Sequence, residues 1–178
     1  MNKDQLRKDL IDQRFSLDEE VVSFAGTRVV RYLLDYIEPS NFTAIGSYSP
    51  IHREINIEPI ELKLPKANFY LPKVMDLKSR ILVWGVRPLE PGFKGILEPI
   101  EIKEDVTLDM VLVPCIGFND QGYRLGYGGG FYDSYLNRLE SRPHIVGIAY
   151  NFSRSTFMAE SHDHRLDAVV TELGITIF

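Results

Sequence analysis

Residues 109–133 read DMVLVPCIGFNDQGYRLGYGGGFYD, and this stretch shows how the chain is organised. It begins with an uninterrupted apolar run, which is typical of a strand buried on both faces of a parallel sheet. A turn signal near residues 119–122 and a glycine-rich loop follow. Apolar and aromatic side chains then recur at helical spacing from Tyr132 to Leu139. The stretch therefore predicts a buried strand, a loop and a helix.

The rest of the chain repeats this alternation of strand and helix. Uninterrupted apolar runs of strand length are Thr43–Tyr48, Asn68–Leu71, Ile81–Val86, Met110–Val113, His144–Tyr150 and Ala168–Thr171. Helices are predicted over residues 2–14, from Ser16 to Ile37 and over residues 56–62 with Asn56 as the cap. The second of these helices starts with capping-box spacing between Ser16 and Glu19. We expect an α/β fold with a mostly parallel sheet flanked by helices, in three α/β/α layers.

One segment contains too many prolines and glycines to form a long helix or strand. Residues 87–105 carry Pro88, Pro91 and Pro99 together with two glycines, so we expect a loop across the surface. No internal repeat or low-complexity tract interrupts the pattern, and we expect one domain over residues 1–178.

Composition narrows the function classes. The 178 residues are 44% hydrophobic and 25% charged, a mixture that suits one soluble domain. The net charge of −5 disfavours nucleic-acid binding, and no apolar run is long enough to span a membrane. The single cysteine, Cys115, lies in an apolar run and is expected to be inert. A cytoplasmic location fits these features best.

The glycine-rich loop carries the clearest chemical signal. Gly126, Gly128, Gly129 and Gly130 allow the backbone to approach a ligand closely, and backbone N–H groups in such a loop can bind phosphate. Arg124 precedes them and can make a forked contact with phosphate oxygens. The alternative is a tight strand-to-helix turn with no ligand.

Asp133 follows the loop within the first predicted helical turn. A carboxylate beside phosphate oxygens is a suitable ligand for Mg²⁺, which usually takes one or two carboxylates plus phosphates. The spacing matches neither common nucleotide motif: the lysine of G-x-x-x-x-G-K-[ST] is missing, and Phe131 occupies the third glycine position of G-x-G-x-x-G.

The loop, read from Arg124 to Asp133 as RLGYGGGFYD, strongly resembles the signature of the 5-formyltetrahydrofolate cyclo-ligases, also called methenyltetrahydrofolate synthetases. The resemblance extends along the chain through KDQLR at residues 3–7, YSP at 48–50 followed by Glu54, GILEP at 95–99, and HD at 162–163 leading to DAVVTE at 167–172. Two positions depart from the pattern. Phe131 stands where tyrosine is frequent, and Gly129 stands where some members carry lysine.

The resemblance implies an ATP-dependent ring closure. In this family ATP phosphorylates the formyl oxygen of 5-formyltetrahydrofolate, N10 attacks the activated carbon, and phosphate leaves to give 5,10-methenyltetrahydrofolate and ADP. Such a reaction demands positioning and charge neutralisation around a phosphoryl group rather than a protein nucleophile.

The resemblance also implies roles by position. It assigns ATP binding to Lys3, Arg7, Arg124, Leu125, Gly126, Tyr127, Gly128, Gly129, Gly130, Phe131 and Tyr132. It places Tyr48, Ser49 and Glu54 in the folate-contacting segment, and it makes Asp167 a second Mg²⁺-associated carboxylate beside Asp133. Arg124 and Tyr132 are the two residues that we expect to act in catalysis.

Each of these residues also has a purely structural reading. Lys3 and Arg7 would otherwise belong to a solvated helix face, Glu54 would cap a short helix, and Asp167 would be an ordinary turn residue. His162 and His164 suggest zinc, yet no third ligand at a suitable spacing follows. Two other functions remain open: another enzyme that uses ATP or a sugar phosphate, and a non-catalytic folate or nucleotide sensor.

Overall fold

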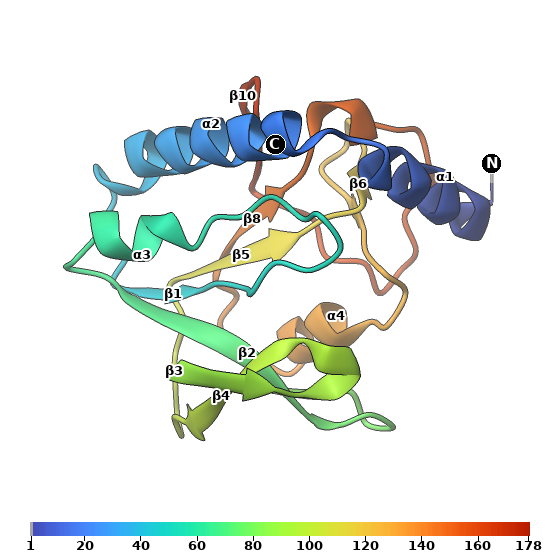
Figure 1. The fold of residues 1–178 in the computed structure, drawn as a ribbon. Helices are drawn as coiled ribbons and strands as arrows, with labels where there is room; N and C mark the ends of the chain where they lie inside the picture. The colour runs from blue at the N-terminus through green and yellow to red at the C-terminus, as the bar shows by residue number, and fades with distance from the viewer. Residues whose placement is uncertain (1) are drawn as a thin grey trace.

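A computed structural model describes residues 2–178 and contains one central sheet (Figure 1). The eight-stranded sheet has the order β10-β9-β8-β5-β1-β2-β3-β4, and a separate two-stranded ribbon pairs β6 with β7. The run β9-β8-β5-β1-β2 is parallel throughout, whereas β10, β3 and β4 pair in antiparallel fashion. The predicted mostly parallel α/β sheet is confirmed.

The helices are α1 (Lys3–Phe15), α2 (Glu19–Ile37), α3 (Pro59–Lys63) and α4 (Phe131–Leu136), with short 3₁₀ turns at Phe93–Gly95 and Asn151–Ser153. The strands are β1 (Ala44–Gly46), β2 (Asn68–Asp76), β3 (Ile81–Pro91), β4 (Leu97–Ile102), β5 (Met110–Pro114), β6 (Gly117–Phe118), β7 (Arg124–Leu125), β8 (His144–Ile148), β9 (Ala168–Thr171) and β10 (Gly174–Ile177). Each of the six predicted strands is present.

Two hydrophobic cores lie on opposite faces of the sheet. One face packs against α2 and α3, through residues such as Leu33 and Ile60. The other face packs against α4, through Tyr135 and Leu136. Successive side chains of β5 point to opposite faces of the sheet, so Leu112 packs in the first core and Val111 in the second. This alternation explains why the strand sequence is apolar without interruption, and it confirms the three layers.

Three local predictions need correction. The predicted loop over residues 87–105 contains the end of β3 and all of β4. The prolines are tolerated because β4 is the edge strand of the sheet and Pro88 lies at a shift in the β3–β4 register. Ser16 does not begin the second helix: its hydroxyl donates to the Gln13 carbonyl at the end of α1. The third helix begins at Pro59, three residues later than predicted.

The connections of the sheet reverse direction between β1 and β5, which makes this place a topological switch point. These strands are neighbours, yet the chain leaves β1 towards β2 on one side and leaves β5 towards β8 on the other. The crossovers also lie on opposite faces, since α3 packs with α2 and α4 packs on the other side. In open α/β sheets, ligands bind beyond the carboxyl ends of the strands at such a switch point.

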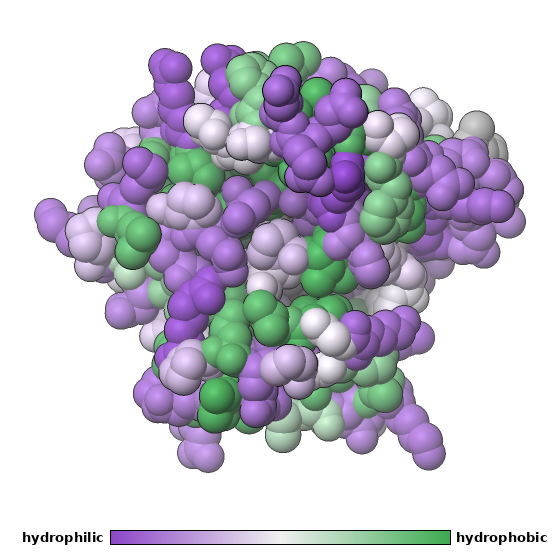
Figure 2. Space-filling model, viewed as in Figure 1, coloured by the Kyte–Doolittle hydropathy of each residue, from purple (hydrophilic) through white to green (hydrophobic). Residues whose placement is uncertain are grey.

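Polar side chains dominate the face of the molecule seen in Figure 2, and hydrophobic side chains gather mainly over β3 and β4. Leu97 and Ile100 of β4 are among the exposed apolar residues. Across residues 2–178, every helix is too short or too polar to cross a membrane.

Candidate functional site

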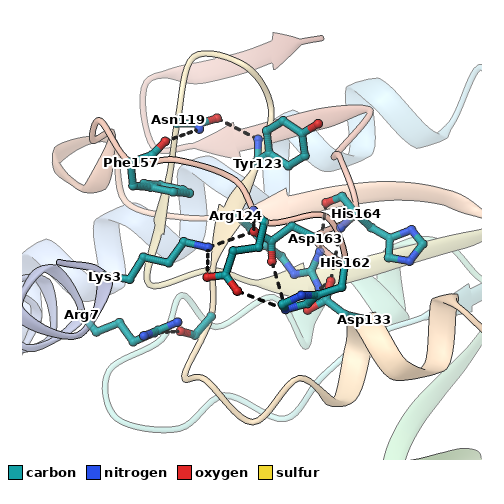
Figure 3. Close-up of polar contacts among 12 residues, drawn as sticks. Lys3, Arg7, Asn119, Tyr123, Arg124, Asp133, Phe157, His162, Asp163 and His164 are labelled. Carbon is teal, nitrogen blue, oxygen red and sulfur yellow. Dashed lines mark hydrogen bonds and ion pairs between the residues drawn. The ribbon is translucent and has the colours of Figure 1, made fainter. Parts of the chain in front are cut away.

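The glycine-rich loop is held by the ribbon of β6 and β7, which follows β5 directly. Asn119, buried in the turn of the ribbon, accepts a hydrogen bond from the Tyr123 N–H at 2.9 Å and donates one to the Phe157 carbonyl at 3.1 Å (Figure 3). The turn is thereby tied to the segment that follows β8. This support fixes the point at which Arg124 enters the loop.

Backbone conformation requires glycine at two positions of the loop. Gly128 has φ of 86° and Gly130 has φ of 66°, both in the region that side chains disfavour. Gly129 is constrained differently, because a Cβ there would lie 2.9 Å from the ring of Phe131. The two departures from the family signature are therefore in contact, and the Phe131 ring fills the space that a side chain at position 129 would need.

Arg124 lies beneath the loop and is already paired. Its guanidinium donates to the Asp133 carboxylate at 2.6 Å and to the His164 carbonyl at 3.3 Å. The side chain of Arg124 is only 7% exposed and that of Asp133 18%. Because Asp133 neutralises it, Arg124 orders the start of α4 in addition to any contact with phosphate.

Helix α1 brings Arg7 to the glycine-rich loop and Lys3 to the segment that contains Glu160 and Asp163 (Figure 3). The Arg7 guanidinium donates to the Gly126 carbonyl at 2.8 Å. Lys3 makes ion pairs with Glu160 at 2.8 Å and with Asp163 at 3.0 Å. Residues from the first turns of the chain thus lie beside a loop more than a hundred residues away. Glu160 was not among the residues singled out in the sequence, because acidic loop residues are common.

Glu54 is a buried carboxylate at the other side of the loop. It is 6% exposed and accepts a hydrogen bond from the Ile51 N–H at 2.9 Å. Burial raises the pKa of Glu54, while that N–H group, the Arg14 charge and the Tyr127 hydroxyl act in the opposite direction. Glu54 therefore does not sit exposed as a helix cap. His52, from the same segment, lies near Tyr127 of the glycine-rich loop, with ring centroids 6.3 Å apart.

Arg14 was missed by the sequence analysis. It lies on α1, is 3% exposed, and donates to the Tyr127 hydroxyl. Its buried Nε has no hydrogen-bond partner among residues 2–178. Arg14 thus connects α1, the helix that also carries Lys3 and Arg7, to the glycine-rich loop. Its charge also acts on Glu54. An arginine late in a weakly amphipathic helix gives no sequence signal of burial.

The remaining predicted folate and catalytic residues cluster nearby. Tyr48 follows β1 and donates from its hydroxyl to the Ile55 carbonyl at 2.7 Å, and Ser49 is buried beside it. Burial raises the pKa of Tyr132, and the charge of Glu54 raises it further. Tyr132 therefore keeps its phenolic proton at neutral pH and can act as a hydrogen-bond donor. The segment after β1 and the loop after β5 meet as the switch point requires.

Asp167 lies elsewhere. It directly precedes β9, accepts from the Ile145 N–H at 2.7 Å, and pairs with Arg142 at 2.8 Å. These contacts place it at the amino ends of β8 and β9. Asp133 follows the loop that leaves the carboxyl end of β5, and no partner is common to the two carboxylates within residues 2–178. The structure does not bring together the two residues predicted to share Mg²⁺.

The histidines and the cysteine have other surroundings. His164 is hydrogen-bonded to the Asn137 side chain at 3.0 Å, and His162 is mostly exposed near Glu160. No group of three or more potential metal ligands occurs in the described part of the chain. Cys115 is buried, and burial raises the pKa of its thiol to about 12. The thiol is therefore protonated and unreactive at neutral pH, as expected from the sequence.

Comparison with known proteins identifies the family. Residues 1–172 match the model of the 5-formyltetrahydrofolate cyclo-ligase family. A 5-formyltetrahydrofolate cyclo-ligase of Mycoplasma pneumoniae is 29% identical over 176 residues, which cover 97% of this chain and 99% of the relative. The corresponding enzyme of Haemophilus influenzae is 27% identical over 171 residues, or 90% and 91% of the two chains.

Solved structures show the same fold. The 5,10-methenyltetrahydrofolate synthetase of Mycoplasma pneumoniae superposes with a TM-score of 0.80 at 27% identity, covering 97% of this chain and 99% of its own. That of Aquifex aeolicus gives 0.83 at 30% identity, with 99% and 93% covered. On a family match that spans nearly the whole chain, this protein belongs to the 5-formyltetrahydrofolate cyclo-ligase family.

Proposed function

We propose that this enzyme closes the ring of 5-formyltetrahydrofolate in a reaction that consumes MgATP. The formyl oxygen attacks the terminal phosphorus and ADP leaves; N10 then attacks the activated carbon, and phosphate leaves to give 5,10-methenyltetrahydrofolate. The observation that carries the proposal is the approach of the segment after β1, which contains Glu54, to the glycine-rich loop, where the ring centroids of His52 and Tyr127 lie 6.3 Å apart. With Glu54 as the folate carboxylate and the loop as the phosphate site, this approach would supply the proximity that transfer of phosphate to a folate requires.

The nucleotide side is formed by the loop and α1. Backbone N–H groups from Gly126 to Gly130 bind the phosphates, and Arg7 and Lys3 supply positive charge from the helix. Lys3 is held by Glu160 and Asp163, so phosphate oxygens must compete with these carboxylates. Arg124 holds Asp133 in place and contributes a permanent charge beneath the loop.

The folate side is formed by the segment after β1. An ionised Glu54 accepts hydrogen bonds from pterin N–H groups, and Tyr48 and Ser49 complete the wall beside it. Tyr132, which keeps its proton, donates to oxygens that gain negative charge as phosphate is transferred. The partners in this proposal are small molecules, and the location is cytoplasmic.

The residues present fit Mg²⁺ through one carboxylate. Mg²⁺ bound to a nucleotide takes most of its ligands from phosphates and water, and needs only one or two protein carboxylates. Asp133 is the carboxylate beside the loop and would hold the ion, which neutralises charge on the transferring phosphoryl group. Asp167 is occupied by Arg142 and the Ile145 N–H, so we propose a structural role for it.

A single assay tests the function. The protein is incubated with MgATP and 5-formyltetrahydrofolate while the methenyl chromophore and ADP are measured together. Equal amounts of both products support the cyclo-ligase. ADP without chromophore would indicate another phosphate-transferring enzyme, and binding of both ligands without turnover would indicate a sensor.

The two aspartates are expected to respond differently to amide substitution. Asp133→Asn should raise the Mg²⁺ concentration needed for half-maximal activity, because an amide binds Mg²⁺ less well than a carboxylate. Asp167→Asn should lower the melting temperature and leave the Mg²⁺ requirement unchanged, because it weakens a cap on two strands. Mg²⁺ titrations and thermal melts of both variants check this. A raised Mg²⁺ requirement in Asp167→Asn would restore the shared site.

A further inference from the structure

The turn between β2 and β3 places Arg80 against the glycine-rich loop. β2 ends at Asp76 and β3 begins at Ile81, so residues 77–80 form the whole connection. The Arg80 side chain reaches Gly130 closely enough that a Cβ built on Gly130 would lie 3.3 Å from the Nη1 atom of Arg80. A cation from a distant hairpin thus meets the end of the loop that leads into α4.

The position of Arg80 is fixed by contacts of its backbone. The Ser79 N–H donates to the Asp76 carboxylate at 2.6 Å, which closes the turn. Arg138, just after α4, donates to the carbonyl of Arg80 at 3.4 Å and to that of Ser79. The hairpin is therefore attached to the end of α4, the helix that follows the glycine-rich loop. Arg80 itself has φ of 51°, a conformation that the turn imposes.

Arg80 differs from Arg124, Lys3 and Arg7 in its lack of an acidic partner, and from Arg14 and Arg138 in that its guanidinium makes no hydrogen bond. Arg124 pairs with Asp133, Lys3 pairs with Glu160, and Arg7 pairs with Asp4. The Arg80 guanidinium makes no ion pair or hydrogen bond with residues 2–178. Its full charge is available to a ligand.

A cavity of about 290 Å³ opens beside this guanidinium. Its lining includes Arg80, Gly130, Asp133, Arg138 and His162. It therefore combines an unpaired arginine, a glycine of the phosphate loop and the carboxylate that we propose for Mg²⁺. Arg7 lies at the opposite end of the loop, where it contacts Gly126.

We propose that Arg80 binds the terminal phosphate of the nucleotide in this cavity. The inference rests on the proposed function, since it takes the loop to be the phosphate site. The phosphate chain then runs along the loop from Arg7 to Arg80, and its terminal group lies beside Asp133. A guanidinium suits this task because it stays charged and presents several N–H donors to phosphate oxygens.

Arg80→Met and Lys78→Met form a matched pair that tests the assignment. Lys78 is an exposed cation of the same turn, and its side chain makes no hydrogen bond or ion pair with residues 2–178, so its loss controls for net charge. Calorimetry with ATP and with ADP, both with Mg²⁺, gives the affinities. Arg80→Met should weaken ATP binding by about tenfold to hundredfold while ADP affinity stays nearly unchanged. Lys78→Met should leave both unchanged.

The possible failures are distinguishable. Equal ATP affinities for Arg80→Met and Lys78→Met would overturn the Arg80 site alone. Equal losses for ATP and ADP would place Arg80 on an inner phosphate and contradict the terminal assignment. A wild-type protein that binds no ATP would overturn the proposed function, and the Arg80 site with it.

Discussion

Arg124→Ala is expected to lower the affinity for ATP by about tenfold to hundredfold and also to destabilise the fold. A charge-assisted hydrogen bond contributes about 1.5–3 kcal/mol, which corresponds to that loss of affinity. The second effect follows from burial, because the variant leaves the Asp133 carboxylate without its ion-pair partner in a largely buried position. Calorimetric ATP titration and denaturant unfolding measure the two effects separately.

Arg154→Ala provides the surface comparison. Arg154 pairs with Asp120 at 2.5 Å, but both side chains are more than half exposed. Breaking this pair should change the free energy of unfolding by less than about 1 kcal/mol. Adding Asp133→Ala to Arg124→Ala should recover part of the lost stability, because it removes the unpaired carboxylate. If Arg124→Ala matched Arg154→Ala in both stability and ATP affinity, Arg124 would have neither role.

Glu54→Gln is expected to weaken binding of 5-formyltetrahydrofolate by about 1.5–3 kcal/mol and to leave ATP affinity nearly unchanged. The amide can accept hydrogen bonds from the pterin only through its oxygen, and its NH₂ group faces pterin donors unfavourably. Titration of each ligand alone by calorimetry decides between the two sides of the site. A loss confined to ATP would move Glu54 to the nucleotide side, and equal losses would indicate a damaged fold.

Glu54 should also make folate binding depend on pH. Burial raises the pKa of Glu54, and the carboxylate accepts pterin N–H groups only when ionised, so folate affinity should increase as the pH rises through this raised pKa. The stability effect has the opposite sign. A carboxyl with a raised pKa in the folded state favours folding while protonated, and this contribution is lost as the pH rises through that value.

Arg14 offers an independent check on the same carboxylate. Removal of its charge in Arg14→Met should raise the pKa of Glu54 further, because that charge favours the ionised form. The rise of folate affinity with pH should therefore move to higher pH in Arg14→Met and disappear in Glu54→Gln. A purely structural role for Arg14 would lower the affinity at every pH without moving the profile.

Local sequence pattern predicted the strands of the sheet and the glycine-rich loop of the candidate site. Uninterrupted apolar runs located the six strands that were predicted, and in β5, β8 and β9 the reason is burial on both faces of the sheet. Glycine density located the loop that we propose for phosphate, because only glycine readily adopts the backbone conformations seen at Gly128 and Gly130. The family resemblance added Glu54 and the cations of α1, which pattern alone would have left as surface residues.

Tertiary structure decided which of these residues meet. The neighbouring positions of β1 and β5 in the sheet bring Glu54 to the loop, and no local pattern encodes the order of strands. Long-range contacts also give Asp167 and Asp133 different partners, since Arg142 and the Ile145 N–H hold Asp167 while Arg124 holds Asp133. Arg14 and Arg80 gave no sequence signal, because an arginine is usually exposed and its burial or its approach to a loop depends on long-range packing.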